Sequence, residues 1–584
     1  MGALSETSVV PGWSGRHAVE LYVRTYSTML QSSGEIRLDT LVQAHIGMAS
    51  SLHPLASRPQ MDMGAFIYAV RRLPTAINHA RRVVLGQSLR GFQQTLASDL
   101  TLWQRVKAPA RRRAWYYDGE SILAVLLASP SDIDDLVPTL VAYQIEWNKL
   151  HRAVREAGVD PERVRCSVQA SEDDWQRLRE AWGPEFEATL ALAGRRECHL
   201  LLRMVGGSHV GYARGAALWW QPAQAVLEDL GLVDAPVYFL SSNSHSLVNL
   251  LSGVPRRLER EIVEHASRYS PELTAELRKL EAGLTPASRD NWLYFAARGL
   301  FDQHPEAPAF RRRRAEMERE VGIRHIAAER MGIDSAVQVI RLAALDPEYL
   351  DPRIGAVDPK ALRASPAVLI NIDYPLGIAA YHILRQVAQS VPWLRGVYIL
   401  GKAATLNADV GDVMIPNVIY NEHSANTYWL DNCFSAADVQ PHLVFGSALD
   451  NQRAVTVRGT FLQNRDYLEL YYQGRYTVVE MEAGPYLDAC FEVQHPDRHP
   501  MHEHVNMSRL AFDLGIIHYA SDTPYTQART LGARGLSYRG VDATYAATIA
   551  VARRILALEG VLDEERAPCG SQGGAETPRR RRPR

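Results

Sequence analysis

Polar residues follow three apolar runs in the second half of the chain, and they are the first candidates for chemistry. Each run is short, apolar and contains β-branched residues, which is typical of a buried strand. The polar groups are Gly401-Lys402 after residues 396–400, Glu480-Met481-Glu482 after 476–479, and Ser521-Asp522 after 515–520. Ligand groups in open α/β sheets collect at the carboxyl ends of the strands. We therefore expect carboxylate, hydroxyl and ammonium groups to share one site.

These strands must belong to a larger sheet. After Pro366 the strand and helix signals alternate regularly, with a strand expected at 367–372 and a helix at 377–388. Another apolar strand, at 236–243, leads into a helix at 246–251. Such alternation indicates an α/β fold with a central, largely parallel sheet and helices on both faces.

The first part of the chain has a different pattern. Between Gly15 and about Arg155, apolar residues recur at helical spacings, as in Ile122-Val125-Leu126, so we expect a mainly helical region without strands. A short strand is expected at 198–205. The boundaries we predict are a helical N-terminal domain (1–165), a connecting α/β segment (166–235), an α/β domain (236–566) with a helical insertion at about 254–362, and a disordered basic tail (567–584).

Composition is that of an ordinary globular protein. The 584 residues are 46% apolar and 22% charged, and the net charge of -2 argues against a dedicated nucleic-acid surface. The sequence has no run of about 20 apolar residues and no signal-peptide pattern, so we expect a cytoplasmic protein without membrane contact. Five widely spaced cysteines without a CxxC pair indicate neither a disulfide framework nor a zinc site. Lysine is rare here, which draws attention to Lys402.

Three segments, in this order and spacing, resemble the nucleoside phosphorylase and nucleosidase superfamily. Residues 400–416 are similar to its glycine-rich turn and following strand, Val479-Glu-Met-Glu-Ala483 to its "VEMEA" signature, and Ser521-Asp522 to the position of its catalytic aspartate. Within the superfamily the AMP nucleosidases look most similar, through residues 367–372, 459–467 and 521–524. The resemblance covers about residues 236–556. It implies a three-layer fold and cleavage of a purine N-glycosidic bond, with release of the free base.

The resemblance also implies roles for individual residues. Bond cleavage builds negative charge on the departing base and positive charge on the ribose, so an acid and sugar anchors are needed. Asp522 would be the acid, Met481 and Glu482 would bind the ribose, and Phe461 would stack on the base. The alternatives are a helix cap for Asp522 and core packing for Met481 and Phe461.

The sequence departs from the superfamily around the expected phosphate site. Lys402-Ala403-Ala404 replaces glycine and serine after Gly401, and Asp373 stands where a glycine-rich turn is usual. Lys402 would supply a point charge to a substrate phosphate, or it is an exposed turn lysine. Asp373 would activate water or repel phosphate, which favours hydrolysis over phosphorolysis. A third possible function is that of a nucleotide-binding protein with a degenerate pocket. Arg465 and Ser521 are further candidate site residues.

Other features carry less information about function. We interpret His495, His499, His502 and His504 as a solvated loop, because their spacing does not fit a metal site. We interpret Arg111-Arg112-Arg113 as a solvated helix end rather than a nucleic-acid contact. We expect no metal and no cofactor, a small nucleoside or nucleotide as the partner, and a homo-oligomer.

Overall fold

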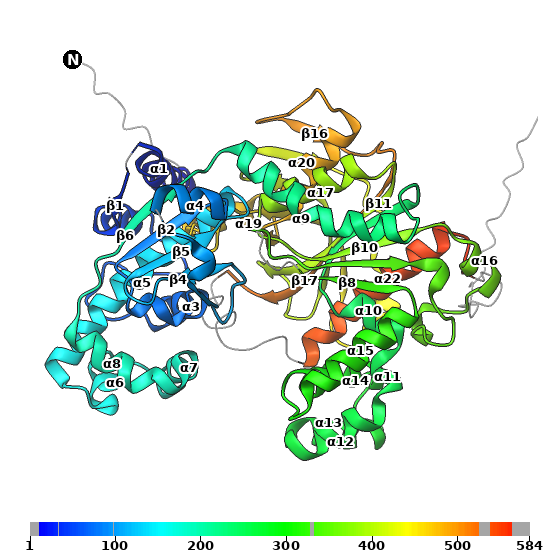
Figure 1. The fold of residues 1–584 in the computed structure, drawn as a ribbon, viewed down its shortest axis with the longest axis horizontal. Coiled ribbons are helices and arrows are strands. Elements are labelled where there is room, and N and C mark those ends of the chain that lie inside the picture. The colour runs from blue at the N-terminus through cyan, green and yellow to red at the C-terminus, as the bar shows by residue number, and fades with distance from the viewer. Residues whose placement is uncertain (1–10, 33, 97, 328–331, 525–537, 563–584) are drawn as a thin grey trace, which may run out of the picture.

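The computed structural model describes residues 11–562 apart from 33, 97, 328–331 and 525–537. The chain forms two units, each built around its own β-sheet (Figure 1). We call residues 11–205 the N-terminal unit and residues 209–562 the C-terminal unit. The basic tail expected at 567–584 lies outside the described residues.

The N-terminal unit contains a six-stranded sheet. Its strands, in spatial order, are β1 (Ile36–Arg37), β6 (Leu201–Val205), β2 (Arg82–Gly86), β5 (Ile122–Leu126), β4 (Trp115–Tyr117) and β3 (Gln104–Val106). Strands β6, β2 and β5 run parallel, and the other pairs are antiparallel. The strand expected at 198–205 is confirmed as β6, and it pairs with strands that precede it by more than 70 residues.

The expectation that residues 15–155 lack strands is wrong. Ile122-Val125-Leu126, which has helical spacing, forms β5, and the apolar run in β2 is a second buried strand. Both strands are buried nearly throughout, so they have no alternation of polar and apolar residues. Helices nevertheless make up much of this unit. The principal ones are α1 (Pro11–Ser32), α3 (Met63–Arg72), α5 (Pro130–Ala157), α6 (Pro161–Ser167), α7 (Glu172–Trp182) and α8 (Phe186–Arg195).

The C-terminal unit contains an eleven-stranded mixed sheet. Its central strands are β7 (Pro236–Ser242), β10 (Val368–Asp373), β11 (Trp393–Thr405), β15 (Val478–Glu480) and β17 (Asp513–Asp522). These confirm the five strands expected from the apolar runs. The other strands are β8 (Ile323–Ile326), β9 (Val337–Arg341), β12 (Val413–Asn421), β13 (Asn426–Trp429), β14 (Ala448–Thr456) and β16 (His504–Asn506).

Strand directions bring the candidate residues together. Strands β10, β7, β11 and β17 are successive parallel neighbours, so their carboxyl ends lie at one edge. Strand β15 is antiparallel to β11 and meets it at residues 404–405, which brings the end of β15 to the same region. Strand β17 also pairs with β12. The strands β11, β15, β14, β12 and β17 therefore form a closed circuit of hydrogen-bonded pairs.

Helices cover both faces of this sheet, as the sequence predicts. One face packs against α9 (His209–Asp229), α17 (Ala379–Ser390) and α20 (Ala483–Gln494). The other packs against α10 (Ser246–Ser252) and α22 (Tyr538–Leu558). Among the described residues, no helix combines the length and the apolar composition that a membrane span requires.

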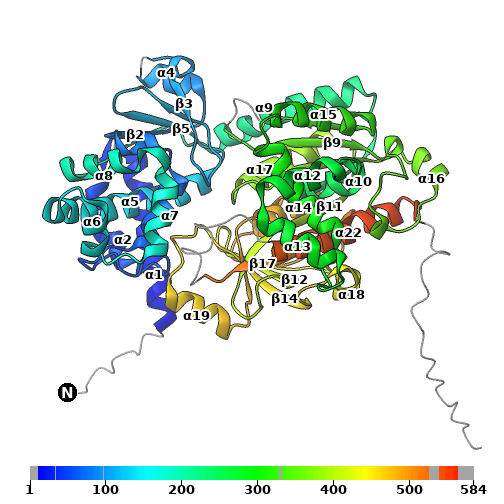
Figure 2. The ribbon, with the colours of Figure 1, turned by 90° about the horizontal axis from the view of Figure 1, so that it is seen from below.

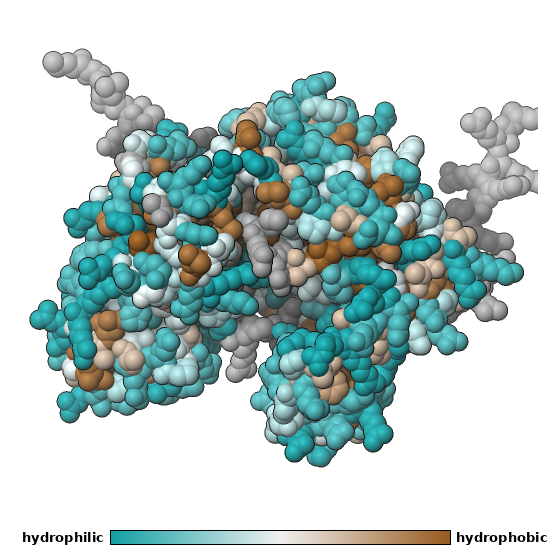
Figure 3. Space-filling view, in the orientation of Figure 1, coloured by the Kyte–Doolittle hydropathy of each residue, from teal (hydrophilic) through white to brown (hydrophobic). Residues whose placement is uncertain are grey.

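The insertion after β7 is only partly helical. It begins with α11 (Val254–Arg257), α12 (Glu259–Tyr269), α13 (Pro271–Glu281), α14 (Arg289–Asp302) and α15 (Ala307–Glu320). Strands β8 and β9 follow, and they extend the sheet beyond β10 in antiparallel fashion. The insertion expected to be helical at about 254–362 therefore also contributes two strands, β8 and β9, to the sheet. Its helices form a separate lobe with a largely hydrophilic face (Figure 3).

The two units are joined by direct contacts. Helix α19 (Arg465–Gln473) of the C-terminal unit lies beside α1 (Figure 2). The Asn464 side chain donates a hydrogen bond to the Met48 carbonyl at 2.8 Å, and Leu462 belongs to the core of the N-terminal unit. Near the strand ends, the Ile378 amide donates to Ser131 Oγ at 2.9 Å. The N-terminal unit is therefore placed against the edge that carries the candidate residues.

Candidate functional site

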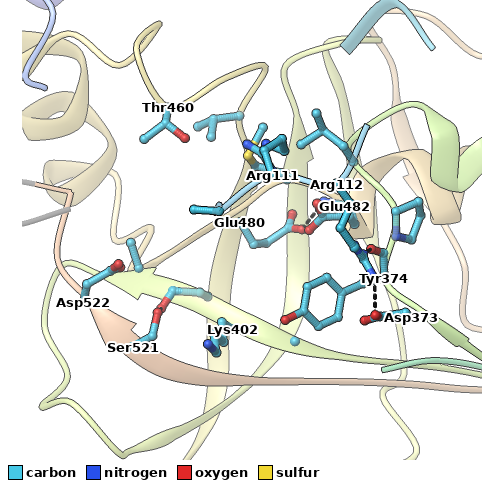
Figure 4. A pocket seen from close by; sticks show the side chains of 18 of the residues that line it. Arg111, Arg112, Asp373, Tyr374, Lys402, Thr460, Glu480, Glu482, Ser521 and Asp522 are labelled. Atoms are coloured by element: carbon cyan, nitrogen blue, oxygen red, sulfur yellow. Dashed lines mark hydrogen bonds and ion pairs between the residues drawn. The ribbon is translucent and has the colours of Figure 1, made fainter. Parts of the chain in front are cut away.

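A cavity of about 710 Å³ lies at the carboxyl ends of β10, β11, β15 and β17. Both units line it, and Figure 4 shows how its polar side chains surround the space. Six of the predicted site residues contribute to it from three strand ends: Gly401, Lys402, Met481, Glu482, Ser521 and Asp522. Asp373, at the end of β10, lines it as well. The structure therefore brings these predicted residues together around one cavity, while their roles stay predictions.

Asp522 ends β17 and is 2% exposed. In the parallel pair with β11, Ala403 faces Ala520 and Ala404 faces Asp522, so the register shifts by one residue at this point. Such a shift redirects the side chains of the strand that carries the additional residue. The Ser521 hydroxyl, on that strand, donates to the Ala403 carbonyl at 3.4 Å.

Lys402 lies within β11, opposite Tyr519 of β17, and is half-buried. The alternative of an exposed turn lysine is therefore wrong. Burial and the charge of Arg298 lower the pKa of Lys402, and the charge of Asp522 opposes that shift. Arg298 comes from α14 of the insertion and lines the cavity too.

The two carboxyl groups after β15 have different surroundings. Glu480 Oε2 accepts hydrogen bonds from the amides of Glu482 and Ala483, at 2.6 and 2.7 Å, and Oε1 accepts from the Thr456 hydroxyl. Glu480 therefore caps the start of α20, and burial raises its pKa to about 7. Burial and the charge of Glu480 raise the pKa of Glu482 to about 8. A backbone hydrogen bond from Gly377 and the charge of Arg111 oppose this second shift.

Asp373 is held by an arginine of the N-terminal unit. Arg112 donates to Asp373 Oδ2 through Nη1 and to the Tyr374 carbonyl at 3.0 Å through Nη2. Its Nε lies 3.9 Å from Asp334. Burial raises the pKa of Asp373 and the charge of Arg112 opposes that shift, whereas burial raises the pKa of Asp334 to about 6. Arg112 thus bridges two acidic side chains at the cavity.

Sequence reasoning missed the contribution of the N-terminal unit. Tyr68, Arg72, Arg111 and Arg112 all line the cavity. The interpretation of residues 111–113 as a solvated helix end is wrong, because they lie between β3 and β4, and Arg111 and Arg113 form ion pairs with the buried Asp135. His518 of β17 also lines the cavity, and burial lowers its pKa to about 4. Local patterns gave no signal for Arg72 or His518.

Two predicted site residues lie elsewhere. Phe461 is 2% exposed and packs against N-terminal residues, with its ring 5.2 Å from that of Tyr68 in an edge-to-face arrangement. It is absent from the cavity lining, and core packing is the reading that its surroundings favour. Arg465 begins α19, is exposed and is likewise absent from the lining. Both residues are therefore removed from the candidate site.

No group of three or more potential metal ligands occurs in the part of the chain that the structure describes. In the segment that contains the four histidines, one of them contacts a carboxyl group instead. His499 Nδ1 lies 2.6 Å from Glu492 Oε1. The side chains at the cavity are chemically suited to acid–base work and to binding an anion, since they combine carboxyl groups with guanidinium and ammonium groups.

Comparison with protein families identifies one model, described as a family of unknown function (DUF6909), which matches residues 38–557. The chain belongs to the DUF6909 family. That match spans both units and therefore all the residues that line the cavity. No curated protein matches the chain.

Solved structures with some similarity include nucleosidases and phosphorylases. The 5'-methylthioadenosine/S-adenosylhomocysteine nucleosidase of Neisseria meningitidis, bound to methylthio-immucillin-A, has 14% identity and a TM-score of 0.27. The match covers 41% of this chain and 94% of that one. The purine nucleoside phosphorylase of Toxoplasma gondii, bound to immucillin-H, has 12% identity and a TM-score of 0.27, with 56% and 92% covered.

Proposed function

We propose that the protein hydrolyses the N-glycosidic bond of a purine nucleoside or nucleotide, on a three-layer fold of the nucleoside phosphorylase type. One observation carries this proposal. Lys402 lies near the end of β11, Glu482 follows β15 and Asp522 ends β17, and all three line a single cavity. The resemblance with the nucleosidase superfamily, and with the AMP nucleosidases within it, assigns Glu482 to the sugar and Asp522 to the base, and Lys402 stands where the superfamily has its phosphate turn.

Asp522 is the acid in this proposal. As the bond between ribose and base breaks, the base takes the bonding electron pair and needs a proton. The Asp522 side chain is 2% exposed and lines the cavity, so it can meet a base bound there with little competition from water. The proton passes from Asp522 to the departing base, and water supplies the oxygen that the ribose carbon receives.

Glu482 and Met481 hold the sugar in this proposal. The Glu482 carboxylate accepts hydrogen bonds from the ribose hydroxyls, and the Met481 side chain packs on the ring. The pKa of about 8 for Glu482 means that ligand hydroxyls must favour the ionised form for these bonds to form at neutral pH. Substrate binding is then coupled to loss of a proton from this carboxyl group.

Asp373 is the candidate for activating the attacking water. A general base must be ionised, and the ion pair with Arg112 favours that form. The same ion pair offsets the repulsion that an isolated Asp373 would exert on phosphate. Phosphorolysis is therefore the alternative reaction, with Gly401 and Lys402 binding inorganic phosphate. A non-catalytic nucleotide-binding protein is the second alternative, supported by Lys402-Ala403-Ala404 in place of the glycine and serine of the superfamily.

Product analysis tests the proposal. The protein is incubated with a panel of purine nucleosides and their 5'-monophosphates, and free base is measured by chromatography, with and without inorganic phosphate. We expect base release without phosphate. A strict phosphate requirement would replace hydrolysis by phosphorolysis, and ligand binding without any base release would favour the non-catalytic alternative. We further propose a homo-oligomer in the cytoplasm, which sizing by light scattering and fractionation of cells test.

A further inference from the structure

Two arginines of the N-terminal unit form one side of the cavity, and the proposed reaction assigns them no role. Arg72 ends α3, and Arg111 lies in the segment between β3 and β4. We call Arg72 and Arg111 the N-terminal wall. The resemblance to nucleosidases begins near residue 236 and does not cover this wall. Its function must therefore be argued from its own contacts.

Buried partners fix both side chains. Arg111 Nη2 lies 2.9 Å from Asp135 Oδ1, and Arg113 Nη2 lies 2.8 Å from Asp135 Oδ2. Asp135 thus holds residues 111–113 in place through ion pairs with two of their arginines. The Arg72 guanidinium lies 3.4 Å from the centre of the Tyr68 ring and donates to the Tyr68 carbonyl at 3.3 Å. Guanidinium groups held in this way lose little further entropy when a ligand binds.

The N-terminal wall retains donors and positive charge. The buried Nε atoms of Arg72 and Arg111 have no hydrogen-bond partner among the described residues. Arg72 is 6% exposed and, within the described part of the chain, lies within 4.0 Å of no carboxylate. A buried cation without a carboxylate in direct contact costs free energy, so an anion that enters the cavity would relieve this cost.

The wall lies next to the proposed sugar site. The charge of Arg111 acts on Glu482, and the two side chains lie close together in Figure 4, with Lys402 and Asp522 farther away across the cavity. A group attached to the ribose would therefore meet the arginines while the base points toward Asp522. Guanidinium groups match the geometry of phosphate oxygens through paired donors.

From these observations we propose that the N-terminal wall binds the phosphate monoester of the substrate, so that the preferred substrates are nucleoside 5'-monophosphates. This inference rests on the proposed function for the position of the sugar. It gives the N-terminal unit a direct part in substrate selection, since Arg72 and Arg111 would contact the phosphate that a nucleoside lacks.

Calorimetric titration with ribose 5-phosphate and with ribose tests the inference without requiring turnover. For Arg111→Gln we expect ribose 5-phosphate to bind about tenfold more weakly or worse, the scale of one charge-assisted bond, and ribose to bind unchanged. Asp135 keeps its ion pair with Arg113 in this variant, so the fold should persist. Arg111→Lys, which keeps the charge but loses the paired donors, should bind ribose 5-phosphate several-fold more weakly.

Arg105→Gln is the matched control, because Arg105 lies on β3, is exposed and does not line the cavity. It should leave both titrations unchanged. No binding of ribose 5-phosphate by the wild type, or equal losses for ribose and its phosphate in Arg111→Gln, would overturn the inference. Inorganic phosphate that binds as tightly as ribose 5-phosphate, with the same loss in the variant, would replace the monoester by the free ion.

The two proposals fail in different experiments. Absence of base release from every nucleoside and nucleotide would remove the proposed reaction, while the ribose 5-phosphate titrations would still report on the N-terminal wall. Conversely, base release with equal kcat/KM for a nucleoside and its 5'-monophosphate would keep the reaction and overturn the phosphate assignment.

Discussion

The charged side chains on the two sides of the cavity differ in their partners and in their pKa shifts. On the N-terminal wall, Arg111 forms an ion pair with Asp135. Burial alone would raise the pKa of Asp135, but the charges of Arg111 and Arg113 outweigh burial and hold that pKa below its ordinary value. On the opposite side, Lys402 and Asp522 form what we call the strand-end wall. Lys402 has no carboxylate within 4.0 Å among the described residues, and burial lowers its pKa.

This difference separates recognition from proton transfer. Permanently charged guanidinium groups with fixed partners suit the binding of an anion that does not change during the reaction. A lysine whose pKa is lowered by burial, near a buried carboxyl group, suits a reaction in which a proton moves. The N-terminal wall should therefore determine which substrate binds, and the strand-end wall how fast it reacts.

The largest expected effect lies on the strand-end wall. Asp522→Asn should keep the fold and the binding of free base but lower kcat by roughly 100-fold or more, the scale of a positioned general acid. Asp513→Asn is the matched control, because Asp513 begins the same strand and pairs with Arg554, far along β17 from Asp522. It should lower stability with little change in kcat. Unchanged turnover in Asp522→Asn would leave only the helix-cap reading.

Lys402→Ala tests which wall binds the phosphate. If Lys402 acts on the proton-transfer side, its loss should lower kcat/KM by roughly tenfold for a nucleoside and for its 5'-monophosphate alike. The exposed Lys360 provides the control variant, Lys360→Ala, which should change neither. Steady-state kinetics on the matched substrates decide the question. A loss confined to the monophosphate would move the phosphate from the N-terminal wall to Lys402.

Glu482 should make substrate affinity depend on pH. Ribose hydroxyls donate to the ionised carboxylate, and the pKa of Glu482 is about 8 in the free protein. Affinity for a nucleoside should therefore rise several-fold from about pH 7 to pH 9 and level off above the pKa. In Glu482→Gln this rise should disappear, and nucleoside binding should weaken while free base binds as before. A variant with the wild-type pH profile would assign the titration to another group.

Local sequence patterns were sufficient to predict where the residues of the strand-end wall lie. An apolar run followed by Lys402 or Asp522 marks a buried strand and its polar end within a few residues, and parallel neighbours then bring these ends together. The N-terminal wall has no such local signature. Arg72 ends a helix and Arg111 lies between two short strands, and they line the same cavity as Glu482 only because the two units pack together. Contacts of this kind depend on tertiary packing, which residue periodicity does not encode.

The error at Phe461 has a related cause. An aromatic residue in a loop that resembles a base site has the right chemistry for stacking, but its neighbours decide whether a base can reach it. Here Leu52, Ala65, Tyr68 and Ala142 of the N-terminal unit occupy that space. The unit that supplies arginines to the cavity thus removes an aromatic ring from it.

The smallest expected effect on catalysis follows from this packing. Phe461→Leu should lower the free energy of unfolding by on the order of 1 to 2 kcal/mol, because it removes part of a buried ring at the contact between the units. KM and kcat should stay close to the wild-type values, since the side chain does not line the cavity. Phe491→Leu is the matched control, because Phe491 is also buried but packs in the core of the C-terminal unit. Thermal unfolding and steady-state kinetics of both variants provide the measurement. If Phe461→Leu raised KM several-fold while Phe491→Leu did not, the ring would have to reach the base, and the N-terminal unit would have to move away from the strand ends when substrate binds.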